Sequence, residues 1–197
     1  MAKLKAPLFS FEARGALAKS LVYFPWKGIS AVRSYVIPAN PNTTSQDAQR
    51  TKLENAVDEW HAASYNALDV TAWNRLATIA TKTMSGFNRM AQEHILQAIL
   101  GNVWTRINHG GSYGVLTTSF KVGCTKAAAG PVPTVRWGTS KTAMLSSNAM
   151  ANIGGDDWEY TIPALTKDTL YYFTIDVGVA ATTWGRLGIY SQRTAAA

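Results

Sequence analysis

The first part of the chain carries two apolar runs that predict β-structure. Residues 21–24 (Leu-Val-Tyr-Phe) and 32–37 (Val-Arg-Ser-Tyr-Val-Ile) are rich in β-branched and aromatic residues. Residues 25–28 (Pro-Trp-Lys-Gly) supply turn chemistry between them, and two prolines soon after the second run prevent further regular pairing. We therefore expect residues 1–41 to form an extended β-ribbon of two or three strands. A ribbon of this size is marginal alone and needs a surface to lie on.

From residue 42 the apolar positions recur every three or four residues, which predicts helices. The first is expected over 46–62 with a cap among residues 43–45, the second after Asp69 as its N-cap, and the third after Ser85. Their apolar stripes are Leu53, Ala56, Val57 and Trp60, then Trp73, Leu76, Ala77 and Ala80, then Phe87, Met90, Ala91, Ile95, Ala98 and Ile99. We expect residues 42–108 to form a helical bundle with Trp60, Trp73 and Phe87 in its core.

Beyond residue 109 the apolar period becomes two, which predicts strands separated by segments rich in Gly, Pro, Asn and Asp. The expected strands are 119–124, 134–137, 158–162, 170–177 and 188–193. This pattern is typical of a small all-β sandwich over 109–197. The sequence His109-Gly110-Gly111 is interpreted as a linker, with a domain boundary near 108–112. The predicted fold class is α+β: a β-ribbon and three-helix bundle, followed by a sandwich.

The amino-acid composition excludes some classes of protein. Of 197 residues, 47 % are apolar and 16 % are charged, against about 25 % charged in an average soluble domain. This excludes a disordered tail or a long solvated coiled coil, and indicates that something, for example other protein copies, covers part of the surface. The net charge is +7, and residues 1–41 hold six basic residues against Glu12 alone. The excess positive charge is therefore concentrated in the N-terminal ribbon.

The sequence offers no candidate for catalysis or for a cofactor. One cysteine, Cys124, excludes an internal disulfide and a cysteine-based zinc site. The three histidines are far apart: His61 and His94 are expected on helix surfaces, and His109 in the linker. Neither a Gly-x-Ser-x-Gly motif nor a phosphate-binding loop occurs. We expect no enzymatic activity, no metal and no cofactor.

No apolar stretch approaches the roughly 20 residues that a membrane helix needs. The basic start of the chain lacks the apolar core of a signal peptide, since Glu12 and Arg14 arrive too early. We therefore expect a protein that is made in the cytoplasm and has no membrane partner.

Residues 165–175, Leu-Thr-Lys-Asp-Thr-Leu-Tyr-Tyr-Phe-Thr-Ile, resemble the fibronectin type III family, over about 85 residues of the chain. The family pattern is Leu-x-Pro-x-Thr-x-Tyr-x-apolar-x-apolar, and Lys167 replaces the proline. The resemblance implies that Tyr171 forms a tyrosine corner and that Phe173 and Ile175 point inward, while Tyr172, Thr174 and Asp176 point outward. It also implies that the ring of Trp137 is buried between the sheets. Such domains are mostly spacers and binding surfaces.

Residues 15–95 combine a basic ribbon with Tyr23-Phe-Pro-Trp26-Lys-Gly28, a helical module with Trp60 and Trp73, and Ser85-Gly-Phe-Asn88 before the last helix. In this combination they are similar to small structural proteins of tailed phages and prophages. It implies a virion protein that assembles with major capsid or tail proteins and with copies of itself, as a capsid decoration, head or tail accessory component. The expected partner-binding residues are Tyr23, Trp26, Lys27, Arg33 and Tyr35, as apolar anchors and cations of the ribbon.

Two alternatives from other classes stay open. The ribbon's cations and interleaved aromatic residues could bind phosphates and stack on bases, so a nucleic-acid partner is an alternative. No predicted helix face is strongly basic, which favours protein docking instead. Alternatively, aromatic residues of the sandwich such as Tyr172, Trp184 or Tyr190 could stack on sugar rings of a host-surface glycan, as in an adhesion module.

Overall fold

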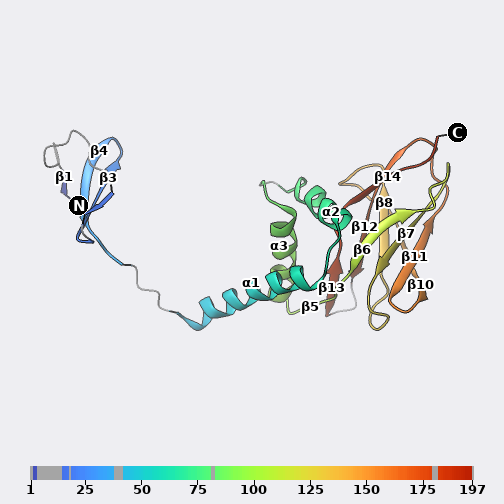
Figure 1. Ribbon diagram of the computed structural model, residues 1–197, viewed down its shortest axis with the longest axis horizontal. Helices are drawn as coiled ribbons and strands as arrows, with labels where there is room; N and C mark the ends of the chain where they lie inside the picture. Colours follow the sequence, from blue (N-terminus) through green and yellow to red (C-terminus); the bar gives the residue numbers. More distant parts are fainter. Residues whose placement is uncertain are drawn as a thin grey trace. The chain divides into compact units, whose positions relative to one another are not determined.

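The computed structural model describes residues 2–3, 15–17, 19–37, 42–80, 83–178 and 182–196. The chain divides into two compact units, Met1–Thr43 and Thr44–Ala197 (Figure 1). Their described residues contain three α-helices and three β-sheets, which confirms the predicted α+β class. Within these ranges, no helix combines the length and apolar character needed to cross a membrane.

The first unit contains an antiparallel sheet in the order β1-β4-β3-β2. Its strands are β1 (Ala2–Lys3), β2 (Gly15–Leu17), β3 (Leu21–Trp26) and β4 (Ile29–Ser34). Lys27 and Gly28 form the turn between β3 and β4, with φ angles of 50° and 77°, as a two-residue type I′ hairpin requires. The predicted turn at 25–28 is too wide, because Pro25 lies within β3, opposite Ser30. The sheet has four strands because short β1 and β2 flank the hairpin.

The second unit begins with the three predicted helices, α1 (Thr44–Ala62), α2 (Ala67–Ala77) and α3 (Gly86–Ile99). Ser85 caps α3 as predicted, since its side chain accepts a hydrogen bond from the Asn88 backbone N–H at 3.2 Å. The predicted N-cap of α2 is wrong. Asn66 is the cap, and its side chain accepts from the Asp69 N–H at 2.9 Å while the Asp69 carboxylate accepts from the Asn66 N–H at 3.2 Å. Asp69 is therefore the acidic member of a capping box.

The rest of the second unit is a sandwich of two sheets (Figure 1). One sheet has the order β10-β11-β7-β6; in the other, β9-β8-β12 continues into β13 and β14, which pair with opposite ends of β12. A short strand, β5, pairs parallel with β13. The bounds are β5 (Val103–Trp104), β6 (Asn108–Tyr113), β7 (Phe120–Thr125), β8 (Thr134–Gly138), β9 (Ser146–Ala149), β10 (Ala151–Gly154), β11 (Asp157–Ile162), β12 (Leu170–Gly178), β13 (Thr183–Arg186) and β14 (Tyr190–Arg193).

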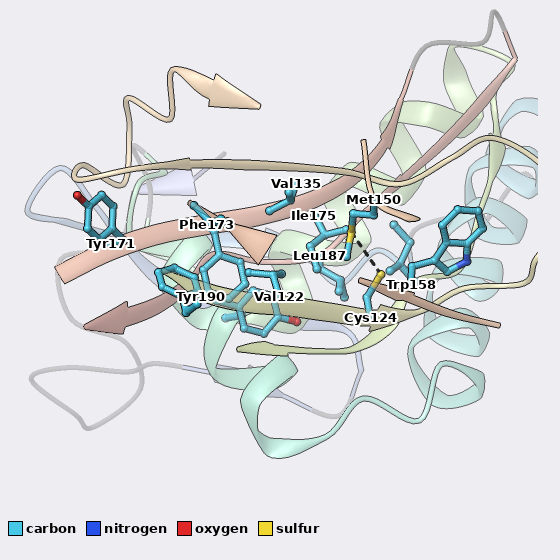
Figure 2. Packing of buried hydrophobic residues seen from close by; sticks show 14 of the residues in the cluster. Val122, Cys124, Val135, Met150, Trp158, Tyr171, Phe173, Ile175, Leu187 and Tyr190 are labelled. Carbon is cyan, nitrogen blue, oxygen red and sulfur yellow. Dashed lines mark hydrogen bonds between the residues drawn. The ribbon is translucent and has the colours of Figure 1, made fainter. Parts of the chain in front are cut away.

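The side chains of β12 fill the core between the sheets as predicted. Phe173 and Ile175 are fully buried, and the Phe173 ring stacks on that of Tyr190 with centroids 5.2 Å apart (Figure 2). The Tyr171 hydroxyl accepts a hydrogen bond from the Thr166 backbone N–H at 3.0 Å, which is the expected tyrosine corner. These contacts give the C-terminal part a fibronectin type III-like sandwich.

The tryptophan predicted to lie between the sheets is the wrong one. Trp137, near the end of β8, is half-buried at the rim of the core, where its ring lies 5.8 Å from that of Tyr160. Trp158 is buried instead, and its indole N–H donates to the Lys126 carbonyl at 2.9 Å. This hydrogen bond satisfies the polar atom that burial would otherwise leave unpaired.

Two residues of β12 predicted to point outward, Thr174 and Asp176, alternate with Phe173 and Ile175 as expected but are buried. The Thr174 hydroxyl donates to the Leu187 carbonyl at 3.0 Å, and Asp176 accepts from Arg136 at 2.7 Å. Tyr172 packs against a cluster that includes Trp73 and Met90 of the helices. The outer face of this sheet is therefore partly covered, which simple alternation does not predict.

The expected linker at 108–112 is part of strand β6 instead. A change of register between Asn108 and Gly111 marks a β-bulge opposite β7, and His109 there has a positive φ of 49°. The bulge directs the backbone N–H groups of His109 and Gly110 to the Asp69 carboxylate, each at 2.9 Å. The strand is held to α2 by these bonds, so the interpretation as a linker is wrong.

Helix α2 packs against the sandwich at residues 187–189, which interrupt the last strand of the sandwich and separate β13 from β14. Between β13 and β14, the Ile189 backbone N–H donates to the Ala72 carbonyl at 2.9 Å. Ala72 itself belongs to the core cluster of the sandwich, whereas Ile189 belongs to that of the helices, with Trp73 and Met90. Helices and sandwich therefore share their buried residues and form one compact unit.

The predicted core of the helices is confirmed in part. Trp73 is fully buried, whereas Trp60 and Phe87 are half-buried and pack edge to face with centroids 5.5 Å apart. On α3 the predicted stripe departs from the buried face, because Ile99 is 56 % exposed and Glu93 is buried. Glu93 is buried since it meets Arg186 of β13 as well as Arg89 of its own helix.

Candidate functional site

The five residues predicted to contact partners all lie in the N-terminal sheet, but they do not form one surface. Tyr23 and Trp26 are three positions apart on β3, so their side chains point to opposite faces. Arg33 lies on the same face as Trp26 by cross-strand pairing. Lys27 occupies the hairpin turn, and Tyr35 follows the end of β4. The structure thus groups Trp26, Arg33 and the adjacent Lys27, and separates Tyr23 from them.

One face of the β3–β4 hairpin, called here the Trp26 face, presents large apolar groups. It consists of three cross-strand pairs, namely Trp26 with Ile29, Phe24 with Ala31, and Val22 with Arg33. Trp26 is 55 % exposed and Ile29 is 41 % exposed. Ala31 is buried. Among the described residues of this unit, it is the only apolar residue whose side chain is buried. Among the described side chains, this face therefore includes two large apolar groups, Trp26 and Ile29, with substantial exposed surface.

Positive charge borders the Trp26 face. The Arg33 guanidinium lies over the Phe24 ring, 5.4 Å from its centroid, in a cation–π contact. Lys27 is exposed at the tip of the hairpin, and Lys19 is exposed in the turn before β3. Residues 15–17 and 19–37 contain no acidic side chain. The described residues around the face therefore carry positive charge and no negative charge.

Three exposed apolar residues of this unit were missed by sequence reasoning. Ile29 pairs with Trp26 and enlarges the Trp26 face. Val36 and Ile37 are strongly exposed beyond the end of β4. The predicted second strand, 32–37, included Val36 and Ile37, but β4 ends at Ser34. Directly after β4, the Tyr35 N–H donates a hydrogen bond to the Ser20 carbonyl at 2.7 Å. The sequence signal for Val36 and Ile37 is the uninterrupted apolar run Tyr-Val-Ile at 35–37. In a strand such a run places apolar side chains on both faces, so the pattern does not tell which of them are buried.

Cys124 lies on β7, within the sandwich core, and has no arrangement around it that activates a thiol. Its sulfur is 3.9 Å from the Met150 sulfur (Figure 2). Burial raises the pKa of the Cys124 thiol to about 12, so the thiolate is scarce near neutral pH. Among the described residues, no three His, Cys, Asp or Glu side chains gather where they could hold a metal ion.

The histidines also lie apart from one another. His61 is exposed on α1, and the His109 side chain is exposed at the bulge of β6. The His94 ring packs on Trp104 with centroids 5.2 Å apart, and burial lowers the pKa of His94. His94 is therefore half-buried rather than a free surface residue.

The aromatic residues considered for sugar stacking are less available than expected. Tyr190 is buried, and its hydroxyl donates to the Asp69 carboxylate, so this residue is excluded as a sugar platform. Trp184 and Tyr172 are half-buried. The Tyr172 ring already carries the Lys141 ammonium, 5.8 Å from its centroid.

The chain was compared with known families, curated proteins and solved structures. No model of a known protein family matches the chain, and no curated protein does. Among solved structures, the chain is similar to the sensor domain of the anti-sigma factor RsgI4 of Pseudobacteroides cellulosolvens, with 16 % identity, a TM-score of 0.36, and coverage of 47 % of this chain and 76 % of that one. It is also similar to a fibronectin type III domain from the human KIAA0970 protein, with 10 % identity, a TM-score of 0.35, and coverage of 59 % and 88 %.

A third similar structure is the sixth fibronectin type III domain of human fibronectin type III domain containing protein 3. It is 12 % identical, with a TM-score of 0.33 and coverage of 49 % of this chain and 89 % of that one. The strand order and the tyrosine corner are the features that define the fold here. The chain is thus an α+β protein with a fibronectin type III-like sandwich at its C-terminal end.

Proposed function

We propose that this chain is a structural protein of a tailed-phage particle that acts by protein–protein assembly and performs no catalysis. The observation that carries the proposal is the Trp26 face, on which an exposed tryptophan and an exposed isoleucine lie beside cations. In the described part of this unit, only one apolar side chain, that of Ala31, is buried. Its partners would be major capsid or tail proteins and copies of this chain.

The physics of such a contact follows from the residues of the face. A tryptophan that becomes buried at the centre of an interface contributes strongly to binding. Arg33 and Lys27 would meet acidic groups at the edge of the contact, which sets orientation and association rate more than affinity. Many copies on one particle would add avidity to a contact that is weak for one copy.

The sandwich would contribute a rigid module that projects from the particle or contacts neighbouring copies. Its proposed role is secondary to that of the Trp26 face. In support, the fibronectin type III-like fold serves mainly as a spacer or a binding surface in other proteins.

The test is capture of particle proteins by the full chain. The tagged chain is coexpressed with major capsid and tail proteins of a tailed phage, and the captured proteins are quantified. The double variant Trp26→Ser/Ile29→Ser should lose at least about tenfold of capture, because truncating a central aromatic anchor costs more than about 1.4 kcal/mol. Leu145→Ser, which changes a 92 % exposed leucine of the second unit, is the control and should capture normally. Equal capture by the double variant would contradict the proposal.

Nucleic-acid binding is the second candidate, because the described N-terminal residues carry Lys19, Lys27 and Arg33 and no carboxylate. A nucleic-acid partner would give an affinity for DNA that falls steeply between about 50 and 200 mM salt. The protein-docking proposal expects weak DNA binding at the higher salt. Substitution of Lys27 and Arg33 by glutamine would abolish DNA binding, whereas Trp26→Ser would affect mainly protein capture.

A further inference from the structure

A cavity of about 590 Å³ lies in the second unit, between α2, α3 and the interrupted last strand of the sandwich. One part of its wall is apolar and includes Leu76, Ile79 and Ile189. The lining also includes three cations, Arg89 of α3, Arg186 of β13 and Lys141 from the segment after β8. The volume falls in the range of sites for small molecules.

The positive charge of this cavity is not balanced by its neighbours. Arg89 and Arg186 share one carboxylate, since their guanidinium nitrogens lie 2.6 Å and 3.8 Å from the same Oε1 of Glu93. The nearby Asp176 is paired with Arg136 at 2.7 Å. In the described ion pairs, the two guanidinium groups of the cavity thus share one carboxylate. The Lys141 ammonium lies over an aromatic ring rather than beside a carboxylate in the described contacts.

The two arginines also keep hydrogen-bonding capacity in reserve. The Nε atoms of both Arg89 and Arg186 are buried without a hydrogen-bond partner, although each side chain as a whole is 24 % exposed. A guanidinium group presents five donors. The described acceptors are the Glu93 carboxylate, which both arginines share, and the Gln92 side-chain carbonyl, to which Arg89 donates at 2.9 Å. These acceptors use only part of the donors of the two arginines. Burial lowers the pKa of Arg186, because loss of solvent disfavours the charged form.

We propose that this cavity binds a small carboxylate with a short apolar chain. The carboxylate oxygens pair with the guanidinium groups of Arg89 and Arg186, which have the fork geometry for planar oxyanions. Lys141 adds a third positive charge at the rim. The alkyl chain lies against Leu76, Ile79 and Ile189, where it displaces water from apolar surface. Neither the Trp26 face nor the assembly role takes part in this binding.

The test uses hexanoate as the probe and the full chain labelled with ¹⁵N, with the Gln92 and Thr142 amide signals followed during titration. Hexanoate should shift these signals with a dissociation constant at least about tenfold below that of acetate, which lacks the chain, and of hexanol, which lacks the charge. Equal binding of hexanol and hexanoate, or no shift with hexanoate, would overturn the proposal.

Variants locate the charge that is responsible. Arg186→Gln should weaken hexanoate binding at least about tenfold, and Lys141→Gln about threefold. The matched control is Arg193→Gln, which removes a surface arginine paired with Asp168 outside the cavity and should bind hexanoate normally. If Arg186→Gln does not fold, Lys141→Gln and Arg89→Gln decide. Unchanged binding in Lys141→Gln, or equal weakening in Arg193→Gln, would also overturn the proposal.

Discussion

Asp69 shows how a single buried residue can join distant parts of this chain. Its carboxylate has no exposed surface and accepts hydrogen bonds from the N–H groups of His109 and Gly110, from the Tyr190 hydroxyl and from the N-cap of its own helix. The sequence places Asp69 near a helix start, which is a local signal. It cannot reveal partners that lie 40, 41 and 121 positions away.

Asp69→Asn should therefore destabilise the second unit. The amide keeps the shape but removes the charge, and its NH₂ group faces a donor where the carboxylate accepted a bond. We expect a loss of about 3 kcal/mol in the free energy of unfolding and a fall of roughly 10 °C in melting temperature, measured by calorimetry. The control is Asp168→Asn at an exposed ion pair with Arg193, where the loss should stay below about 1 kcal/mol.

The raised pKa of Cys124 leads us to expect that the free energy of unfolding decreases at alkaline pH. Its thiol has a pKa of about 12 in the folded chain against 9.0 ordinarily, because it is buried. Since the raised pKa keeps the proton on the folded form, the unfolded form ionises first, and stability falls as pH rises above about 9. Burial also raises the pKa of Tyr190, which adds to the loss above about 10.

The variant Cys124→Val should remove the contribution of the thiol. Relative to the unsubstituted chain, its free energy of unfolding should improve by at most about 1.4 kcal/mol for each pH unit between pH 9 and 12. Urea unfolding at pH 8, 9, 10 and 11 measures this difference. Parallel pH profiles for the two chains would show that Cys124 does not titrate differently on unfolding.

At the scale of elements, the helices and strands follow local periodicity, and most were predicted from it. Their contacts were not predictable, because these depend on irregular points such as the break between β13 and β14. Gly188 lies at this break, and a Cβ atom there would come within 2.2 Å of the Ala72 carbonyl carbon and 2.3 Å of the Trp73 nitrogen. The backbone of α2 approaches the strand so closely only because residue 188 has no side chain.

Gly188→Ala should therefore force α2 away from the sandwich. We expect a destabilisation of about 3 kcal/mol or more, since backbone atoms rather than a flexible side chain must move. Gly111→Ala on β6 is the matched control, because a Cβ atom there meets nothing within 4 Å. Urea denaturation of both variants measures the difference, and equal midpoints would contradict the observed packing of α2.

At the scale of the whole molecule, sequence reasoning recovered the fold class and the ribbon, helix and sandwich segments in order. It failed at the junction of helices and sandwich, where Gly110-Gly111 reads as a linker by composition. Gly110 serves a different purpose there, because a Cβ atom on this residue would come within 2.3 Å of the Tyr190 hydroxyl. Composition cannot distinguish a glycine needed for flexibility from one needed for close packing.

The shared core predicts that helices and sandwich unfold together. In native-state hydrogen exchange, the slowest amides of α2 and of β7 should open with free energies within about 1 kcal/mol of each other. Exchange in α2 that is several kcal/mol easier than in β7 would show that the helices open independently of the sandwich.

The central claim is that the Trp26 face is covered by another protein in the assembled particle. An electron cryo-microscopy reconstruction of that particle tests it most directly, at a resolution that shows side chains. The account predicts that Trp26 and Ile29 lie buried against a capsid or tail protein or another copy of this chain. A particle in which both side chains face solvent while a different surface of the chain makes the contacts would contradict it.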